Sequence, residues 1–165
     1  MPSEPKASRP HMPGYGIAGP DEGKGLLPWS WAEAFIAAAR NYPIVTNRAG
    51  GGVPHAMPVW GVWLDGRLWF STSPTSTKAR NIAHDPRVTV PLAHERDEEA
   101  VVLEGVAEQL PADIDRTKFN AVYKDKYDWD MSGETGPLWA IRPTRVFAFS
   151  ANGDFAGTTT RWTFE

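Results

Sequence analysis

Apolar residues recur at helical spacing in three parts of the chain, and elsewhere they occur in short runs between turn residues. The first predicted helix begins near Ser30 and Glu33, which match a capping box. The other two cover residues 75–84 and 113–127. The apolar side of the first helix is expected to consist of Trp31, Phe35, Ala38 and Ala39, and that of the third of Phe119, Val122, Tyr123 and Tyr127.

Strands are predicted where apolar residues lie between glycine-rich turns. Residues 44–46 lead into Gly50, Gly51 and Gly52, which permit the positive φ angles of a hairpin. The segment 53–64 is apolar on both alternating faces, which indicates a single strand covered on both sides and an interface with a second subunit. Asp65-Gly66 then favours a type I′ turn. Further strands are expected at residues 68–72, 88–92, 101–107 and 145–149.

Strands therefore dominate, with three helices between them, and this order predicts a mainly β, α+β fold built on an antiparallel barrel. No glycine-rich phosphate loop of the dinucleotide-binding type follows any strand, which argues against a doubly wound sheet. Residues 1–27 are rich in Pro and Gly and are interpreted as an extended arm, with residues 1–8 typical of a disordered leader. The barrel domain is expected to comprise residues 28–165.

Composition removes several classes of function. The 165 residues contain no Cys, which excludes thiol nucleophiles, Cys-ligated zinc, iron–sulfur clusters and disulfides. The net charge of −3 and the lack of a basic stripe do not fit a nucleic-acid partner. No targeting signal or membrane-length apolar run is present, so a cytoplasmic location without a membrane span is expected. Eight Trp residues favour an aromatic-lined core or pocket.

Two neighbouring segments carry the candidate chemistry. Residues 71–78 run from a strand end rich in hydroxyl groups into a helix start with Lys78, a combination that suits a phosphate group. An ordinary helix cap with a solvent-facing lysine is the alternative interpretation. In residues 57–60, Pro58 cannot donate to a sheet, which would leave backbone groups for the edge of a flat heterocycle. The alternative there is a packed strand with a bulge.

These segments belong to an ordered series that resembles a known family. The series consists of residues 55–60 (HAMPVW), 65–72 (DGRLWFST), 78–82 (KARNI), 85–88 (DPRV) and 102–108 (VLEGVAE). Over about residues 28–150 the chain is similar to the pyridoxamine-phosphate-oxidase-like split barrels, and among them to the flavin/deazaflavin oxidoreductases. The ending Thr160-Arg161-Trp162 resembles that of the deazaflavin-using branch. The basic set that authentic pyridoxamine-phosphate oxidases use for substrate phosphate is not recognisable.

The resemblance implies an antiparallel split β-barrel that forms a homodimer with two cofactor sites at the subunit interface. The cofactor would be coenzyme F420 or FMN, and the partner a small-molecule substrate. The implied contacts to the ring come from Met57, Pro58, Val59 and Trp60. Those along the cofactor and at its phosphate come from Ser71, Thr72, Ser73, Ser76, Thr77, Lys78 and Asn81. Trp162 would cover the site of the opposite subunit.

Three functions follow from the resemblance. The first is hydride transfer from reduced F420 to an unsaturated organic acceptor, and the second is an FMN-dependent oxidase or reductase on the same fold. The third is a non-catalytic module that binds a cofactor or haem. The cofactor supplies the electrons in the first two, so no catalytic side chain is nominated.

The histidines and the arm complete the sequence-based expectations. His55 lies beside the candidate site, where it either faces the substrate or is hydrogen-bonded within the barrel. No two histidines have the i, i+4 spacing of a helical metal site, so no metal is expected. Residues 9–17 contain side chains able to pack, and they are expected either to fold over a cofactor site, in the same or the partner subunit, or to form a flexible leader.

Overall fold

The computed structural model describes residues 4–16, 25–94, 98–151 and 155–165. They form two units, the first from residues 1–38, 91–104 and 143–165 and the second from residues 39–90 and 105–142. Ile17 and the charged residues 95–97, to which the sequence-based expectations also referred, lie outside the described parts. Three strands pass from one unit into the other: β6 (Arg87–His94), β7 (Glu99–Gln109) and β8 (Leu138–Ser150).

The described strands form one sheet in the order β1-β9-β8-β7-β6-β2-β3, and β5 joins β4 to β8. Every strand pair with a known register is antiparallel. Four α-helices occur among the described residues. The predicted mainly β, α+β fold class is therefore confirmed, although the sheet does not close on itself.

The second unit holds a β-hairpin, a second strand pair and two helices. Its remaining elements are β2 (Tyr42–Thr46), β3 (His55–Val59), β4 (Gly61–Leu64), β5 (Arg67–Ser71), α2 (Thr77–His84) and α3 (Thr117–Tyr127). Both predicted turns are present. The glycines at 50, 51 and 52 have φ angles of 80°, 82° and 96°, and Asp65 and Gly66 have φ angles of 51° and 74°.

The single strand predicted for residues 53–64 is wrong. The strand is interrupted at Trp60, so that β3 pairs with β2 while β4 pairs with β5. At the break, the Gly61 amide donates to the Tyr127 hydroxyl at 3.0 Å. A side chain of α3 thus satisfies the backbone group that an uninterrupted strand would have given to a neighbour.

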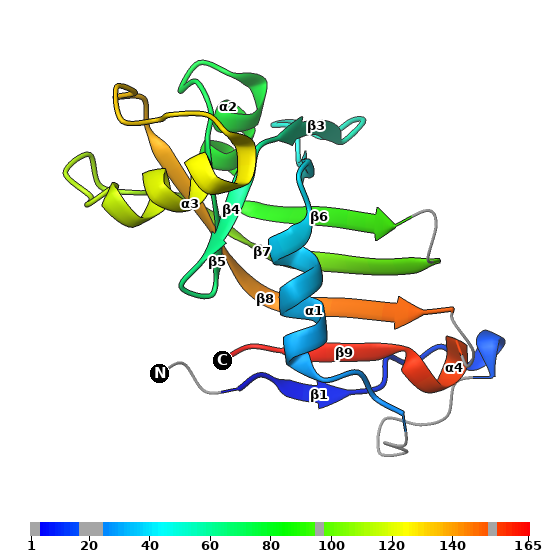
Figure 1. Cartoon of the computed structure of the whole chain (residues 1–165). Helices are drawn as coiled ribbons and strands as arrows, with labels where there is room; N and C mark the ends of the chain where they lie inside the picture. The colour runs from blue at the N-terminus through cyan, green and yellow to red at the C-terminus, as the bar shows by residue number, and fades with distance from the viewer. Residues whose placement is uncertain (1–3, 17–24, 95–97, 152–154) are drawn as a thin grey trace. The chain divides into compact units, whose positions relative to one another are not determined.

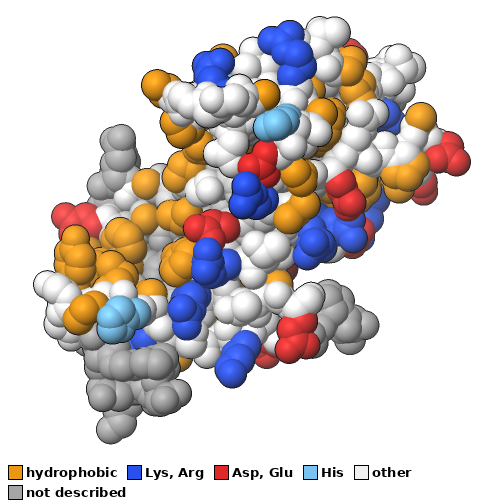
Figure 2. Space-filling model, turned by 180° about the vertical axis from the view of Figure 1, so that it is seen from behind, with side chains coloured by type: hydrophobic (Ala, Val, Ile, Leu, Met, Phe, Trp, Pro, Cys, Tyr) orange, Lys and Arg blue, Asp and Glu red, His pale blue; other side chains and the backbone are white. Residues whose placement is uncertain are grey.

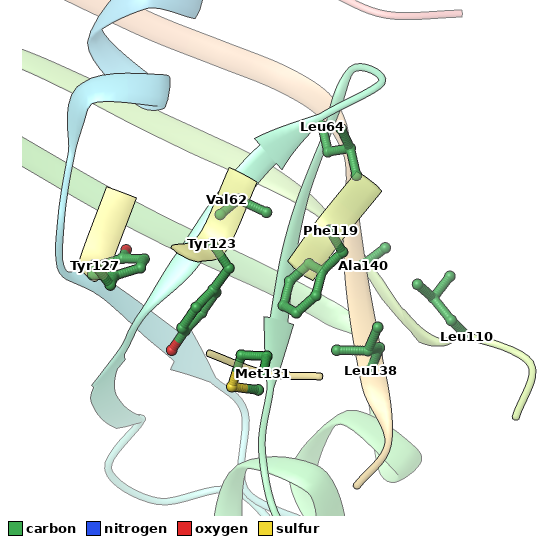
Figure 3. Close-up of a cluster of buried hydrophobic side chains, with 9 residues drawn as sticks. All are labelled: Val62, Leu64, Leu110, Phe119, Tyr123, Tyr127, Met131, Leu138 and Ala140. Carbon is green, nitrogen blue, oxygen red and sulfur yellow. The ribbon is translucent and has the colours of Figure 1, made fainter. Parts of the chain in front are cut away.

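The core of the second unit lies between α3 and the strands (Figure 3). Phe119, Tyr123 and Tyr127 project from α3 onto Val62 and Leu64 of β4 and onto the first residues of β8. They are all less than 10% exposed, whereas Val122 is 36% exposed. The predicted apolar side of α3 is therefore correct except for Val122, although the helix begins at Thr117 and not at residue 113.

The first unit contains the two ends of the chain and the helix α1. Its remaining elements are β1 (Lys6–Ser8), the 3₁₀ turn Pro13–Tyr15, α1 (Trp29–Ala38), α4 (Phe155–Thr158) and β9 (Thr160–Thr163). α1 lies across the strands of this unit (Figure 1). Its Trp29 ring packs edge-on against Trp162 of β9 at 5.6 Å, and its Phe35 ring lies 4.5 Å from that of His94.

The start of α1 differs from the predicted capping box. The helix begins at Trp29, so Ser30 lies within its first turn and not at the N-cap. The Trp31 amide donates instead to the Pro28 carbonyl at 3.0 Å. The buried side consists of Ala32, Phe35 and Ile36, of which only Phe35 was expected.

The N-terminal segment docks on its own chain. Lys6–Ser8 pairs antiparallel with β9, so a wholly disordered leader over residues 1–8 is wrong for these three residues. The Arg9 side chain is 4% exposed and donates to the carbonyls of Ala156 at 2.7 Å and Gly157 at 3.0 Å. Among the described residues, no helix has the length and apolar character needed to span a membrane.

Candidate functional site

The loop from β5 into α2 gathers the predicted hydroxyl groups. Ser76 is the N-cap of α2, and its Oγ accepts a hydrogen bond from the Ala79 amide at 3.1 Å. The Thr72 Oγ1 lies 3.2 Å from the Ser76 Oγ, and the Ser73 Oγ lies 3.0 Å from the Thr75 Oγ1. These contacts fix the turn that presents the start of α2, because each short polar side chain satisfies a neighbour within the same loop.

Lys78, in the first turn of α2, is the unusual residue of this site. The residue is only 5% exposed, and its burial lowers the pKa of the ammonium. Within the described parts of the chain, its Nζ has no recorded hydrogen bond or ion pair. The cap half of the alternative interpretation is present, since Ser76 caps α2 in the ordinary way, but the Lys78 stem is buried and only the tip of the side chain reaches solvent. A buried lysine without a partner is uncommon and often marks a site for an anion.

Asn81 and Thr46 connect α2 to the β2–β3 hairpin. The Asn81 Nδ2 donates to the Thr46 Oγ1 at 2.9 Å, and this hydroxyl donates in turn to the His55 carbonyl at 3.3 Å. Because Lys78 precedes Asn81 by three residues, both lie on the side of α2 that faces the hairpin. Desolvation lowers the pKa of His55, and the positive charges of Arg48 and Lys78 lower it further. The site is electropositive at this end.

β3 presents one open edge. It is the last strand of the sheet path, paired with β2 and with no further strand among the described residues. Pro58 lies directly opposite Pro43 of β2, and neither residue has an amide hydrogen to donate. Met57 is 51% exposed, and Val59 is half-buried. The register of β2 and β3 continues through Pro58, so the predicted interruption of the ladder is absent there, and Pro58 lies instead on an edge strand.

Trp60 forms an aromatic platform at the other end of β3. The residue is 45% exposed, and its ring stacks on that of Tyr127 at 4.8 Å and an interplanar angle of 5°. Below it, the Lys126 Nζ donates to the Tyr42 hydroxyl at 2.7 Å and to the Gly61 carbonyl at 3.1 Å. Burial, with a smaller effect from the nearby Arg40, lowers the pKa of Lys126 to about 8.

Sequence reasoning missed this cluster of Arg40, Tyr42, Lys126 and Tyr127. Its members come from three segments that no motif connects, and Tyr127 was assigned only to an apolar helix side. The one available signal was the uninterrupted run Lys124-Asp125-Lys126-Tyr127, in which a cation precedes a core aromatic residue. The cluster lies at Tyr42, opposite Val59, while Lys78 approaches the hairpin near Thr46 and His55. Four residue steps along β3 separate the two ends by roughly 14 Å.

The remaining predicted residues take other positions. Ser71 ends β5, and its Oγ donates to the Pro137 carbonyl at 3.3 Å. The Thr77 Oγ1 accepts from Arg80 at 3.4 Å. Trp162 is 1% exposed and enclosed by its own chain, where it packs against Trp29. Its ring has no exposed face for a ligand of a second subunit, so we leave Trp162 out of the proposed site.

Comparison of the amino-acid sequence with known protein families identifies the family. Residues 31–150 match the family described as pyridoxamine 5'-phosphate oxidase. The chain belongs to this family. The match contains the β2–β3 hairpin, α2 and α3, and therefore every part of the site just described. No match was found among curated proteins. Among the described residues, no three His, Asp or Glu side chains gather in a way that could hold a metal ion.

Solved structures similar to this pyridoxamine 5'-phosphate oxidase family member confirm the split-barrel fold. An F420 reductase is 21% identical, with a TM-score of 0.57, over 69% of this chain and 94% of its own. A FAD-binding protein from Mesorhizobium loti is 19% identical, with a TM-score of 0.57, over 84% and 96%. The haem storage protein HutZ from Vibrio cholerae is 16% identical, with a TM-score of 0.56, over 69% and 88%.

Proposed function

We propose that the protein is a homodimeric, cytoplasmic oxidoreductase in which reduced coenzyme F420 donates hydride to an unsaturated organic acceptor. The observation that carries this proposal is the buried Lys78 at the start of α2, beside a loop rich in hydroxyl groups. The family match and the similar F420 reductase support a flavin-type cofactor.

The phosphate group of the cofactor fits the start of α2. The amides of Thr77 and Lys78 lie in the first turn, where a helix has no carbonyl of its own to accept their hydrogens. A phosphate there accepts hydrogen bonds from these amides, from the hydroxyls of Ser73 or Ser76, and from the Lys78 ammonium. The ligand thereby supplies the partner that Lys78 lacks among the described residues.

The ring system fits along β3 toward Trp60. The open edge of β3 offers backbone groups in one row, and the exposed Trp60 ring offers a flat surface about one strand length from Lys78. A bound deazaflavin supplies the hydride. The residues of this chain bind and orient the ring and exclude water from it, and we assign no side chain a catalytic role.

FMN is the second candidate because it has the same phosphate and a ring of nearly the same shape, and a FAD-binding protein shares the fold. Haem is the third, supported by the likeness to HutZ and by His55, whose lowered pKa favours the neutral imidazole that ligates a metal. Absorption spectra of the loaded protein separate the three, since bound haem gives a Soret band and a deazaflavin absorbs at shorter wavelength than FMN.

Titration of the purified protein with F420 and with FMN, followed by tryptophan fluorescence, tests the proposal. We expect strong quenching of Trp60 by the preferred cofactor. Lys78→Ala is expected to raise the Kd by roughly 10- to 100-fold, because a charge-assisted hydrogen bond to phosphate is lost. Lys124→Ala, which removes an exposed lysine of α3, is the matched control. An unchanged Kd for Lys78→Ala would overturn the assignment of the phosphate site.

A further inference from the structure

A second cationic site lies in the first unit, on the strands β8 and β9. A pocket of about 250 Å³ is lined by Thr144, Arg145, Arg161 and Thr163. None of these residues belongs to the β2–β3 hairpin or to α2. We propose that this pocket binds a small molecule through a phosphate group, independently of the cofactor site.

The register of the strands places the cationic side chains on one face. Arg145 lies opposite Thr163, and Phe147 lies opposite Arg161. Trp162, between Arg161 and Thr163, points to the other face and packs against α1. The face turned away from α1 carries Lys and Arg side chains with acidic ones between them (Figure 2).

β1 adds to the same face. Lys6 lies opposite Thr163, and Ser8 lies opposite Arg161. Directly opposed residues of an antiparallel pair have their side chains on the same side of the sheet. Lys6 is exposed, so its ammonium can reach a ligand at the rim of the pocket. The N-terminal strand thereby supplies a third cation.

Some guanidinium N–H groups of Arg161 and Arg145 are not used by hydrogen bonds among the described residues. The Arg161 Nε donates to the Ser8 Oγ at 3.1 Å, and its two terminal nitrogens have no acceptor recorded within the described part of the chain. Arg145 uses its Nε and one terminal nitrogen on a single oxygen, the Glu104 Oε2, both at 2.7 Å. Its other terminal nitrogen is not engaged by Glu104.

The charge balance favours an anion with more than one negative charge. Of Lys6, Arg145 and Arg161, only Arg145 has an ion pair with an acidic side chain among the described residues, and that partner is Glu104. Guanidinium groups bind phosphate through paired N–H donors, and two of them here approach one pocket. The Arg145 guanidinium also lies 5.4 Å from the centre of the Phe147 ring, so an apolar surface adjoins the anion site for the rest of the ligand.

Calorimetric titration with methyl phosphate at low ionic strength tests the proposal, with Lys78→Ala protein used to remove the cofactor site. We expect this variant to retain phosphate binding. Adding Arg161→Ala should weaken that binding by roughly ten-fold or more, and Arg161→Lys should restore part of it. Circular dichroism checks that each variant is folded.

Three results would overturn the inference. The first is the loss of all phosphate binding in Lys78→Ala alone, and the second is wild-type affinity in the Arg161 variants. The third is binding of succinate as tight as that of methyl phosphate, which would make the ligand group a carboxylate. Retained affinity in Lys78→Ala, lost with Arg161→Ala, supports the inference whatever the outcome for the cofactor.

Discussion

Lys78 combines a cost to stability with a gain in binding. Partial burial of an ammonium without an ion pair among the described residues removes some of its hydration, which disfavours the charged form and lowers the pKa of Lys78. Proteins retain such groups where a ligand supplies the missing partner. The side chain is therefore expected to stabilise the complex and to destabilise the protein alone.

This balance predicts the effect of Lys78→Met. Methionine keeps most of the apolar stem without the charge, so the free energy of unfolding of the ligand-free protein should rise at pH 7, by at most about 1 kcal/mol because the ammonium still reaches solvent. The gain should shrink as the pH increases from the folded-state pKa of Lys78 toward 10.5, because the wild-type ammonium is then neutral. Guanidinium denaturation at several pH values measures both effects. A variant less stable than wild type at pH 7 would mean that the ammonium has a favourable partner.

Lys126 should give the protein a measurable pH dependence. Its pKa is about 8 in the folded state against 10.5 for an exposed lysine, so the unfolded chain binds more protons between these values. Stability should therefore rise with pH between about 8 and 10, by at most about 3 kcal/mol. Above pH 10 the raised pKa of Tyr42 acts in the opposite direction.

Unfolding free energies at pH 7, 8, 9 and 10 check this prediction for Lys126. The Lys126→Met variant should show a smaller slope than wild type, whatever its absolute stability. Lys124→Met serves as the control, because that side chain is exposed. Equal slopes for Lys126→Met and wild type would contradict the lowered pKa.

At the scale of elements, two substitutions at the cap of α2 distinguish its contribution to stability from its contribution to phosphate binding. Ser76→Ala removes the acceptor for the Ala79 amide and should lower stability by about 1 kcal/mol. Ser76→Asp keeps an acceptor, so stability should remain close to wild type. The new negative charge beside Lys78 should nevertheless weaken phosphate binding. Chemical denaturation and the cofactor titration measure the two effects, and equal affinity in Ser76→Asp and wild type would count against a phosphate at this helix.

The contact between β7 and β8 in the second unit depends on a glycine. A Cβ at Gly105 would lie 2.5 Å from the Arg142 carbonyl oxygen and 2.7 Å from the Ile141 Cγ2. Gly105→Ala should therefore cost roughly 1–3 kcal/mol, since backbone atoms must move. Gly14→Ala is the control, because an added Cβ there meets no atom within 4 Å. Thermal unfolding compares the two variants, and equal melting temperatures would be incompatible with the close approach.

The sequence predicted the elements that depend on neighbouring residues. The Asp65-Gly66 turn is correct, and the helix predicted over residues 75–84 is present as Thr77–His84, because the signals for both lie within a few positions. The first half of β8 was missed, since Pro137 and Pro143 bracket it and resemble strand breakers. The break at Trp60 was missed because it depends on Tyr127, far along the chain.

The parts of the candidate site that depend on neighbouring residues were likewise predictable from the sequence, and those that depend on distant contacts were not. The loop 71–78 and Lys78 follow from local composition, whereas the burial of Lys78 depends on the hairpin that α2 covers. Trp162 was chosen for its ring, but its burial under Trp29 depends on a contact between distant segments. Pattern alone does not show which side of a strand a helix covers.

At the scale of the whole molecule, we predict a homodimer through the region of β3. Val53, Met57 and Trp60 are 78%, 51% and 45% exposed, and they flank an open strand edge. Large exposed apolar side chains in one place are typical of an interface. Light scattering at micromolar concentration should give twice the chain mass of 18.2 kDa. Met57→Glu should shift the protein toward the monomer, and a wild-type mass of one chain would exclude the dimer.

The pairing of β1 with β9 sets an order for folding during synthesis. Lys6 pairs with Thr163, and Arg9 donates to the carbonyls of Ala156 and Gly157, so β1 meets these partners only after the chain has grown through residue 163. The second unit is complete once residue 142 has left the ribosome. The strand β1, by contrast, stays without its partner until β9 has been made. Its edge is open to other nascent chains for that time, and on a polysome this interval is when chaperone protection matters most.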